Sequence, residues 1–297
     1  MSSGTAFDGY EAVRHRLPAA TAGGACRRAA NLEQIADTFD VFLLDAFGVL
    51  NIGETAIPGV AERIGRLRQA GKRFMVLTNA ASYTTAGLVG KYRTLGYDFA
   101  PEDVISSRRT LLQTLRDEPP RQWGIALPRA ADRGDLGIDH LDLEDDAAAY
   151  DAVEGFLLLG SAEWTEARQR LLVAALRDRP RPVWVGNPDI VAPREHGFSI
   201  EPGHYAHRLA DETGVTPRFF GKPFGNIFRA ARARIGAGVA PERIVMVGDS
   251  LHTDILGAQA AGIGSALVTG YGFFAGQDAG AAIAASGIRP DFLLDQP

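Results

Sequence analysis

The chain has 297 residues, which is enough for one large domain or two of ordinary size. Apolar residues make up 46% and charged residues 23% of the sequence, a composition that excludes disorder as the main state. The 31 basic and 36 acidic residues give a net charge of −5, and no stretch concentrates Lys and Arg. Nucleic acid is therefore not an expected partner, because neutralising its phosphates needs a basic face. The single cysteine, Cys26, cannot form an internal disulfide.

The first thirty residues lack the pattern of a secretory signal, and no apolar run reaches the roughly 18 residues of a membrane span. We therefore expect a cytoplasmic protein that does not bind a membrane. Residues 1–30 contain several small residues and predict a loosely ordered arm or an added helix. No chemistry is assigned to this arm.

Short apolar runs alternate with helical patterns after the arm. The runs 41–44 and 74–77 have the length and continuous hydrophobicity of strands that are buried on both faces. Between them, apolar residues at helical spacing over 60–67, followed by Gly71, predict a crossover helix. Residues 88–96 repeat this helix-then-glycine pattern. The order strand, helix, strand, helix predicts a parallel sheet with right-handed connections.

The same alternation returns near the C-terminus, where the runs 244–247 and 266–268 predict strands on either side of a helix that carries Ile255 and Ala258. Both ends of the chain are therefore expected to build one sheet. The middle of the chain has its own set of predicted elements, namely strands at 123–126, 156–159 and 183–185 and a helix with Trp164, Ala167 and Leu171 on one face. This pattern predicts an α/β protein with three parts: an arm (1–30), a core domain (31–116 and 207–297) and an inserted domain (117–206).

Polar residues follow the carboxyl ends of the predicted core strands. Asp45 comes directly after the first strand, and Thr78-Asn79 come after the second. Asp249 follows the run 244–247, and Asp254 lies five residues later, so both carboxylates could approach one divalent cation. In open α/β sheets the carboxyl edge is where ligands bind, which makes these residues a candidate site.

Gly221-Lys222-Pro223 adds a cation in a loop that leads to a helix. A carboxylate nucleophile, a neutral hydrogen-bond donor, a lysine and an acidic pair are the parts needed to transfer a phosphoryl group through an aspartyl intermediate. Magnesium and Lys222 would offset the charge that otherwise keeps Asp45 away from a phosphate dianion.

These motifs, in this order, resemble those of the haloacid dehalogenase superfamily, from about residue 31 to the end of the chain. The insertion between the second and third motifs resembles the subfamily with a C2-type cap, which includes the NagD-like and 4-nitrophenylphosphatase-like enzymes. The resemblance implies a Rossmann-like core with an inserted α/β cap and a magnesium-dependent hydrolase of phosphoric monoesters. It also implies a small phosphorylated substrate, and related capped enzymes often pair as homodimers through their caps.

The resemblance also implies roles for individual residues. Asp45 matches the nucleophile and Lys222 the lysine of the third motif, while Thr78 and Asn79 match the phosphate-binding positions. The implied magnesium ligands are Asp45, the backbone carbonyl of Phe47, Asp249 and Asp254. Asn187-Pro188-Asp189 resembles the NPD signature of the subfamily, and its Asn187 and Asp189 are predicted to bind substrate.

Phe47 departs from the family pattern, in which a second aspartate stands two residues after the nucleophile. That aspartate protonates the leaving group and later activates water, and phenylalanine can do neither. Losing a general acid/base costs on the order of 10² to 10⁴ in rate. The proton could come from Glu195, His196, His252 or a chain of solvent. Because the usual acid is missing, Phe47→Asp should raise turnover of alkyl phosphates if the pocket tolerates the charge, and no gain would mean that the proton comes from elsewhere.

Two other interpretations stay open. A halide leaving group needs no proton, and haloacid dehalogenases carry an aromatic residue at this position, so Phe47 also fits a metal-independent hydrolase of carbon–halogen bonds. Asp249 and Asp254 argue against it, because a metal-binding pair serves phosphate chemistry. The third interpretation is a catalytically silent relative that binds a phosphorylated ligand through Lys222 and Thr78.

Overall fold

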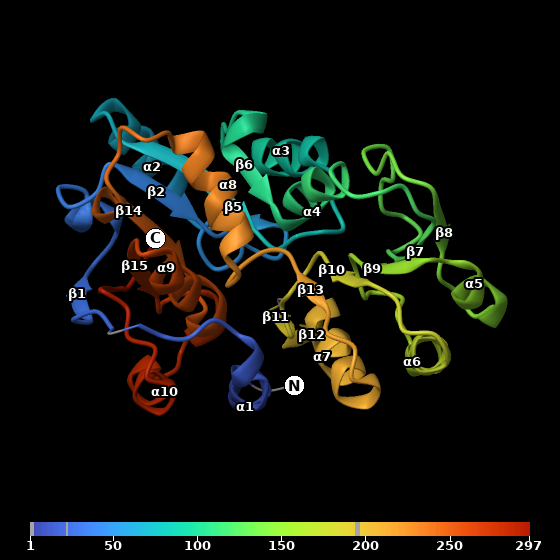
Figure 1. Cartoon of the computed structure of the whole chain (residues 1–297). Coiled ribbons are helices and arrows are strands. Elements are labelled where there is room, and N and C mark those ends of the chain that lie inside the picture. The colour runs from blue at the N-terminus through green and yellow to red at the C-terminus, as the bar shows by residue number, and fades with distance from the viewer. Residues whose placement is uncertain (1–2, 22, 194–196) are drawn as a thin grey trace.

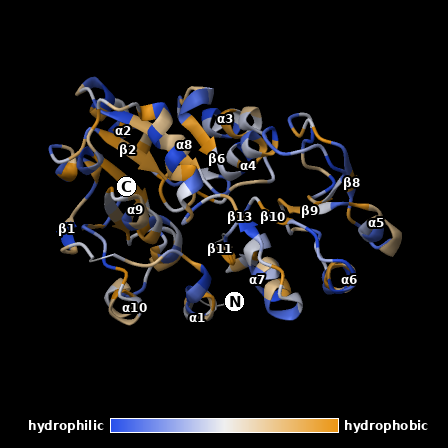
Figure 2. Ribbon diagram, in the orientation of Figure 1, coloured by the Kyte–Doolittle hydropathy of each residue, from blue (hydrophilic) through white to orange (hydrophobic). Residues whose placement is uncertain are grey.

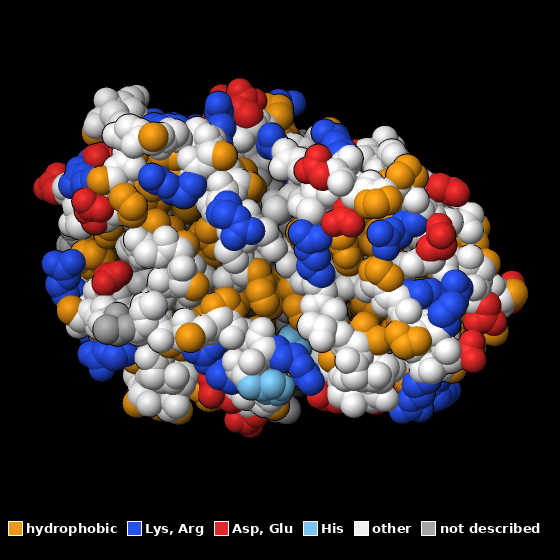
Figure 3. All heavy atoms as spheres, in the orientation of Figure 1, with side chains coloured by type: hydrophobic (Ala, Val, Ile, Leu, Met, Phe, Trp, Pro, Cys, Tyr) orange, Lys and Arg blue, Asp and Glu red, His pale blue; other side chains and the backbone are white. Residues whose placement is uncertain are grey.

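The computed structural model describes residues 3–21, 23–193 and 197–297. Two α/β parts lie side by side, and the chain leaves the first part after α4 and returns to it at α8 (Figure 1). Within the described residues, no helix is both long enough and apolar enough to cross a membrane. On the face drawn in Figure 3, basic and acidic side chains are scattered over both parts of the molecule.

The first part is built on a parallel sheet that has seven strands among the described residues, in the order β1-β16-β15-β14-β2-β5-β6. Its strands are β1 (Arg27–Ala29), β2 (Val41–Leu44), β5 (Arg73–Thr78), β6 (Val104–Ser106), β14 (Ile244–Gly248), β15 (Gly264–Val268) and β16 (Phe292–Leu294). The helices around it are α2 (Val60–Gln69), α3 (Thr85–Thr94), α4 (Ser107–Leu115), α8 (Gly225–Ile235), α9 (Leu256–Ala261) and α10 (Ala279–Ser286). The α/β class and the parallel core sheet predicted from the apolar runs are thus confirmed.

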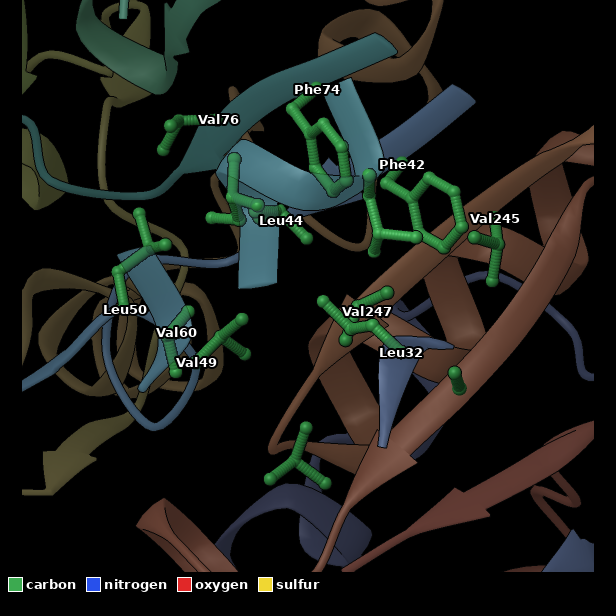
Figure 4. Packing of buried hydrophobic residues seen from close by; sticks show 14 of the residues in the cluster. Leu32, Phe42, Leu44, Val49, Leu50, Val60, Phe74, Val76, Val245 and Val247 are labelled. Carbon is green, nitrogen blue, oxygen red and sulfur yellow. The ribbon is translucent and has the colours of Figure 1, made fainter. Parts of the chain in front are cut away.

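Both faces of this sheet are buried, which explains why its strands read as unbroken apolar runs. Side chains alternate along each strand, so Phe42 and Leu44 pack on one face and Val41 and Leu43 on the other. On the first face Phe42 stacks on Phe74 with ring centroids 5.0 Å apart, and Val60 of α2 belongs to the same buried cluster (Figure 4). Side chains from α8 and α9 cover the second face.

The second part contains a parallel sheet in the order β13-β10-β9-β7-β8, as far as the chain is described. Its strands are β7 (Trp123–Ala126), β8 (His140–Asp142), β9 (Gly155–Leu158), β10 (Val183–Val185) and β13 (Arg218–Phe219), accompanied by α5 (Ala147–Ala152), α6 (Glu166–Asp178) and α7 (Pro202–Thr213). Figure 2 shows hydrophobic strands β9 and β10 and more polar outer helices. Two further pairs of antiparallel strands lie outside these sheets in the described residues, β3–β4 (Asn51–Ile52 and Thr55–Ala56) and β11–β12 (Val191–Pro193 and Phe198–Ile200).

The end of the inserted part differs from the predicted boundary at residue 206, which falls inside α7. Gln169 of α6 donates a hydrogen bond of 3.1 Å to the carbonyl of Tyr205, and β13 pairs with β10 of the second sheet. We therefore propose that the insertion extends from about residue 117 to 220.

The helix predicted around Trp164 begins later than expected. Thr165 caps α6 by accepting a hydrogen bond from the backbone of Arg168, so Trp164 precedes the helix. Ala167 is exposed, and the buried face of α6 carries Leu172 and Leu176 instead of the predicted Ala167 and Leu171. The capping threonine outweighed the apolar spacing that began one residue earlier.

The predicted arm contains α1 (Ser3–Ala12) and, at its end, β1, which joins the edge of the core sheet beside β16. Tyr10 of α1 stacks on His252 of the core with ring centroids 5.0 Å apart. Its hydroxyl also accepts a hydrogen bond of 3.2 Å from the backbone N–H of Ile190 in the second part. The arm therefore contacts both parts of the molecule.

Arg108 of α4 connects the first part to a loop of the second. Its side chain is fully buried and donates hydrogen bonds to the carbonyl of Asp132 at 2.7 Å and to the carboxylate of Asp135 at 3.0 Å. A third bond, of 3.3 Å, reaches the carbonyl of Ala81. A buried guanidinium is stable only when its donors are paired in this way.

Replacing Arg108 by Leu should lower the free energy of unfolding by about 2–4 kcal/mol, because the three acceptors lose their donor. Urea denaturation measures this loss. Arg129→Leu is the matched control, since the Arg129–Glu144 ion pair has side chains that are 68% and 40% exposed. An exposed pair of this kind contributes roughly 0–1 kcal/mol. Equal losses in the two variants would contradict the connecting role of Arg108.

Candidate active site

Three neighbouring strands place acidic and hydroxyl side chains at one edge of the core sheet. β14, β2 and β5 are adjacent, and their carboxyl ends lead to Asp249, Asp45 and Thr78. The backbone N–H of Asp45 donates 2.9 Å to the carbonyl of Val247, which continues the ladder by one residue. Strand order in the sheet has thus brought together residues that are about two hundred positions apart in the sequence.

Lys222 reaches this edge from the loop between β13 and α8. Its Nζ lies 2.6 Å from Oδ1 of Asp45 and 2.7 Å from Oδ1 of Asp254, and the side chain is 2% exposed. Burial opposes the charged form of the amine, but the carboxylates of Asp254 and Asp45 outweigh this effect and raise the pKa of Lys222 above its usual value. The lysine is therefore a permanent cation at the sheet edge.

Asp45, Asp249 and Asp254 form a compact acidic cluster in which one carboxylate oxygen from each lies within 4.8 Å of the others. Burial raises the pKa of Asp249 well above its usual value, and the charges of Asp45 and Asp254 add to the effect. Burial also raises the pKa of Asp254 to about 6, although Lys222 acts against it. One lysine does not balance three carboxylates, so the cluster has the charge and the hard oxygen donors that suit a divalent cation.

Two glycines make room for Asp249. Gly48 and Gly272 have φ angles of 75° and 71°, which favour glycine. A Cβ at position 48 would lie 2.5 Å from Oδ2 of Asp249, and a Cβ at position 272 would lie 1.9 Å from it. The same oxygen accepts a hydrogen bond of 2.8 Å from the backbone N–H of Phe273. The carboxylate is therefore held by backbone that approaches it closely.

Asp254 lies on a π-helical turn, η5 (Leu251–Ile255), which precedes α9. Its Oδ2 accepts a hydrogen bond of 3.1 Å from the backbone N–H of Ser250, and its side chain is fully buried. π-Helical turns occur mostly as single turns, frequently at functional sites.

Asn79 joins Lys222 to the NPD tripeptide. Its Nδ2 donates to Oδ1 of Asp189 at 2.8 Å and to the carbonyl of Lys222 at 2.9 Å. Its Oδ1 accepts from the backbone N–H of Lys222 at 2.8 Å. The amide is thus occupied by two neighbouring residues, although the sequence predicts that it binds phosphate.

Asn187 also makes protein contacts with both ends of its amide. Its Oδ1 accepts a hydrogen bond of 3.0 Å from the backbone N–H of Asp189, and its Nδ2 donates 3.1 Å to Glu201. The side-chain oxygen of Thr78 accepts a bond of 3.2 Å from the backbone N–H of Ala80. These contacts hold the walls of a cleft above the sheet edge.

The cleft has a volume of about 210 Å³ and lies between the two parts of the molecule. It is lined by most of the sequence-predicted site residues: Asp45, Phe47, Thr78, Asn79, Asn187, Asp189, Lys222 and Asp249. Asp254 is fully buried, and its Oδ1 contacts the Nζ of Lys222. Residues that were not predicted also line the cleft, among them Tyr10, Glu54, Lys91, Tyr92 and Glu201. They follow no motif, and only the fold brings them to the site.

The proposed substitutes for the missing acid are not all accessible to the cleft. His252 is 2% exposed, its ring stacks on Tyr10, and its Nε2 pairs with Glu11 of α1. It is not among the described residues that line the cleft. Glu195 and His196 lie outside the described residues.

The fold and the site together define a class of hydrolase with a parallel α/β core, an inserted α/β cap, and an acidic cluster with a buried lysine at one sheet edge. Residues 42–127 match a model for haloacid dehalogenase-like hydrolases, and residues 219–296 match a second model for hydrolases of this kind. The chain belongs to the haloacid dehalogenase-like hydrolase family.

Relatives with curated descriptions and solved structures agree with this assignment. Glycerol-3-phosphate phosphatase from Gallus gallus is 31% identical over 93% of this chain and 96% of its own length. A structure from Cytophaga hutchinsonii, described as a possible sugar phosphatase, is 26% identical with a TM-score of 0.81, covering 92% of this chain and 98% of that one. Glycerol phosphate phosphatase from Mycobacterium tuberculosis in complex with magnesium is 25% identical with a TM-score of 0.69, covering 87% and 75%.

The environment of Asp189 makes stability depend on pH. Burial raises the pKa of its carboxyl to about 8, against the hydrogen bond from Asn79 and the charge of Lys222, while Asp45 and Glu201 raise it further. In the unfolded chain the same carboxyl loses its proton near pH 4. The folded state therefore binds more protons between these values, and stability decreases as the pH rises through this interval.

We expect Asp189→Asn to remove this dependence, because Asn keeps an acceptor for Asn79 and does not titrate. The melting temperature of the variant minus that of the wild type should increase from pH 5 to pH 8. Thermal unfolding with a chelator present measures the difference. A difference that stays constant with pH would show that Asp189 is already ionised at pH 5.

Proposed function

We propose that the protein is a magnesium-dependent phosphatase that hydrolyses a small phosphorylated metabolite through an aspartyl-phosphate on Asp45. The observation that carries this proposal is the position of the Lys222 ammonium, within 2.7 Å of both Asp45 and Asp254 on the floor of the cleft. A phosphate dianion and a carboxylate nucleophile repel each other, and fixed positive charge at their meeting point lowers that barrier. The relatives named as phosphatases support the same conclusion.

In this proposal Asp45 attacks phosphorus while the bond from phosphorus to the leaving oxygen breaks. Water then attacks the phosphorus of the aspartyl-phosphate, which releases inorganic phosphate and restores the Asp45 carboxylate. Lys222 holds the nucleophile in place and offsets negative charge in both steps. Thr78 lies at the neighbouring strand end and provides a hydroxyl for a phosphate oxygen.

The ligands proposed for magnesium are Asp45, Asp249, Asp254 and the backbone carbonyl of Phe47. The oxygen-rich acidic cluster fits this ion, and the space beside Asp249 is kept by Gly48 and Gly272. When bound, magnesium would supply the positive charge that offsets the phosphate oxygens.

The contacts of Asn79 and Asn187 suggest that these residues act by position. Asn79 fixes the backbone of Lys222 and the carboxyl of Asp189, and Asn187 fixes the turn that carries Asp189. Contacts with the rest of the substrate would then come from Asp189 and from the cap side of the cleft. A cytoplasmic location and pairing as a homodimer also remain our proposals.

A carbon–halogen hydrolase is less well supported. It would leave Asp249 and Asp254, which are buried beside Asp45, without a cation to bind. The absence of a general acid at Phe47 also fits a silent phosphate-binding relative, and the activity test below separates it from the phosphatase.

Purified protein should release phosphate from 4-nitrophenyl phosphate with magnesium and lose this activity with a chelator. Asp45→Asn should lower kcat by roughly 10³-fold or more, because the covalent step loses its nucleophile. The matched control is Asp278→Asn, which changes the exposed N-cap residue of helix α10 in the core. Chloride release from 2-chloropropionate without metal would support the dehalogenase, and phosphate binding with neither product would support the silent relative.

Magnesium should raise the melting temperature of the wild type, with about 2.7 kcal/mol of stabilisation at a concentration of 100 times Kd. Asp249→Asn should abolish most of this shift. Without metal the variant should be at least as stable as the wild type, because it no longer buries a carboxylate beside Asp45 and Asp254. A full magnesium shift in Asp249→Asn would exclude Asp249 as a ligand, and Asp278→Asn should keep the full shift.

A further inference from the structure

We propose that Asp189 supplies the proton that Phe47 does not, first as the general acid for the leaving oxygen and then as the general base for water. This inference rests on the proposed phosphatase function. It assigns a catalytic role to a residue on the loop between the cap strand β10 and the hairpin β11–β12.

The carboxyl groups of the cleft leave few candidates for this role. Among the described residues, five acidic side chains line it: Asp45, Glu54, Asp189, Glu201 and Asp249. Asp45 and Asp249 belong to the acidic cluster. Glu201 is 8% exposed and accepts a hydrogen bond from Asn187.

Glu54 is the competing candidate, because it stands in the hairpin turn between β3 and β4, soon after Phe47. However, it is exposed and forms an ion pair of 2.7 Å with Lys91. The ion pair holds this carboxylate beside Lys91.

Asp189 is held in a fixed relation to the nucleophile. Asn79 donates to its Oδ1 at 2.8 Å and, through Oδ1 of its own amide, accepts from the backbone N–H of Lys222. Lys222 in turn contacts Asp45. Within the described ranges, the Asp189 side chain accepts its hydrogen bond from Asn79 through Oδ1. The second carboxyl oxygen of Asp189 therefore remains for a ligand in the cleft.

The surroundings of Asp189 keep it protonated. Lys222 and Asn79 favour the ionised form, but burial and the negative charges of Asp45 and Glu201 dominate and raise its pKa to about 8. Tyr10 of α1 also faces this region, and its hydroxyl is engaged with the backbone of Ile190 and Val191. An acid with a pKa near the working pH is the most effective proton donor.

Both steps balance with Asp189 in this role. As Asp45 bonds to phosphorus, the phosphorus–oxygen bond of the ester breaks, and the Asp189 proton passes to the leaving oxygen to give an alcohol. The Asp189 carboxylate then takes a proton from water as that water attacks the aspartyl-phosphate. Phosphate leaves, Asp45 returns as a carboxylate, and Asp189 is again protonated.

The test compares two esters that differ in their need for protonation, 4-nitrophenyl phosphate and glycerol phosphate. In Asp189→Asn, kcat/KM for glycerol phosphate should fall by roughly 10²- to 10⁴-fold, and that for 4-nitrophenyl phosphate by less than about tenfold. The variant should also show a burst of nitrophenol equal to the enzyme concentration, because hydrolysis of the aspartyl-phosphate loses its base. The decrease of kcat/KM for glycerol phosphate at alkaline pH should disappear.

A second substitution separates the acid from a merely structural role. Phe47→Asp restores a carboxyl at the family position and should recover glycerol phosphate turnover in the Asp189→Asn background, with a much smaller gain in the wild type. A retained magnesium shift of the melting temperature would show that Asp189→Asn is folded and binds metal.

Three results would overturn the assignment: equal losses for the two esters, no loss for either, or the leaving-group-dependent loss in Glu54→Gln instead. In each case wild-type phosphate release would leave the proposed phosphatase function intact. If the wild type released no phosphate from either ester, the phosphatase proposal itself would fail.

Discussion

The site depends on a buried ammonium group between two carboxylates. Lys222 is 2% exposed, and a lone charge in that position would be strongly destabilising, so Asp45 and Asp254 are required as its partners. The same contacts hold Asp45 at the end of β2, facing the cleft. Lys222 follows β13 of the cap sheet and precedes α8 of the core, so these ion pairs also fix the segment through which the chain returns from the cap to the core.

The family pattern places the nucleophile and the general acid/base two residues apart, and this chain has Phe47 at the second of these positions. In our proposal the charges that bring a phosphate ester to Asp45 come from the core, whereas the position that transfers the proton in the family pattern is apolar. In our proposal the proton donor comes instead from Asp189, between the cap strand β10 and the hairpin β11–β12. Proton transfer would then depend on how the cap is seated over the core, which links the chemistry to the closed cleft.

The N-terminal helix adds a third wall to the cleft. Tyr10 stacks on His252 of the core, and its hydroxyl accepts a hydrogen bond from the backbone of Ile190, the residue after Asp189. Arg16, just after α1, also pairs with Asp211 of α7. The segment predicted as a loosely ordered arm or an added helix is therefore part of the contact between core and cap, and its Tyr10 lines the cleft.

Local patterns were sufficient for the elements whose residues interact with their near neighbours. Unbroken apolar runs identified β2, β5 and β14, because strands buried on both faces leave no room for polar residues. The strand positions also predicted that the polar residues at their ends lie together, since the carboxyl edge of a parallel sheet is common to all its strands. Patterns failed at Trp164, where a threonine cap decided the helix start. They also gave no sign that β13, beyond the predicted boundary at residue 206, pairs with β10. They also could not show that Asn79 binds Lys222 and Asp189, that Tyr10 enters the cleft, or that Asp189 is surrounded by negative charge. Such contacts join segments up to about 180 residues apart, and burial and electrostatic environment exist only once those segments have packed.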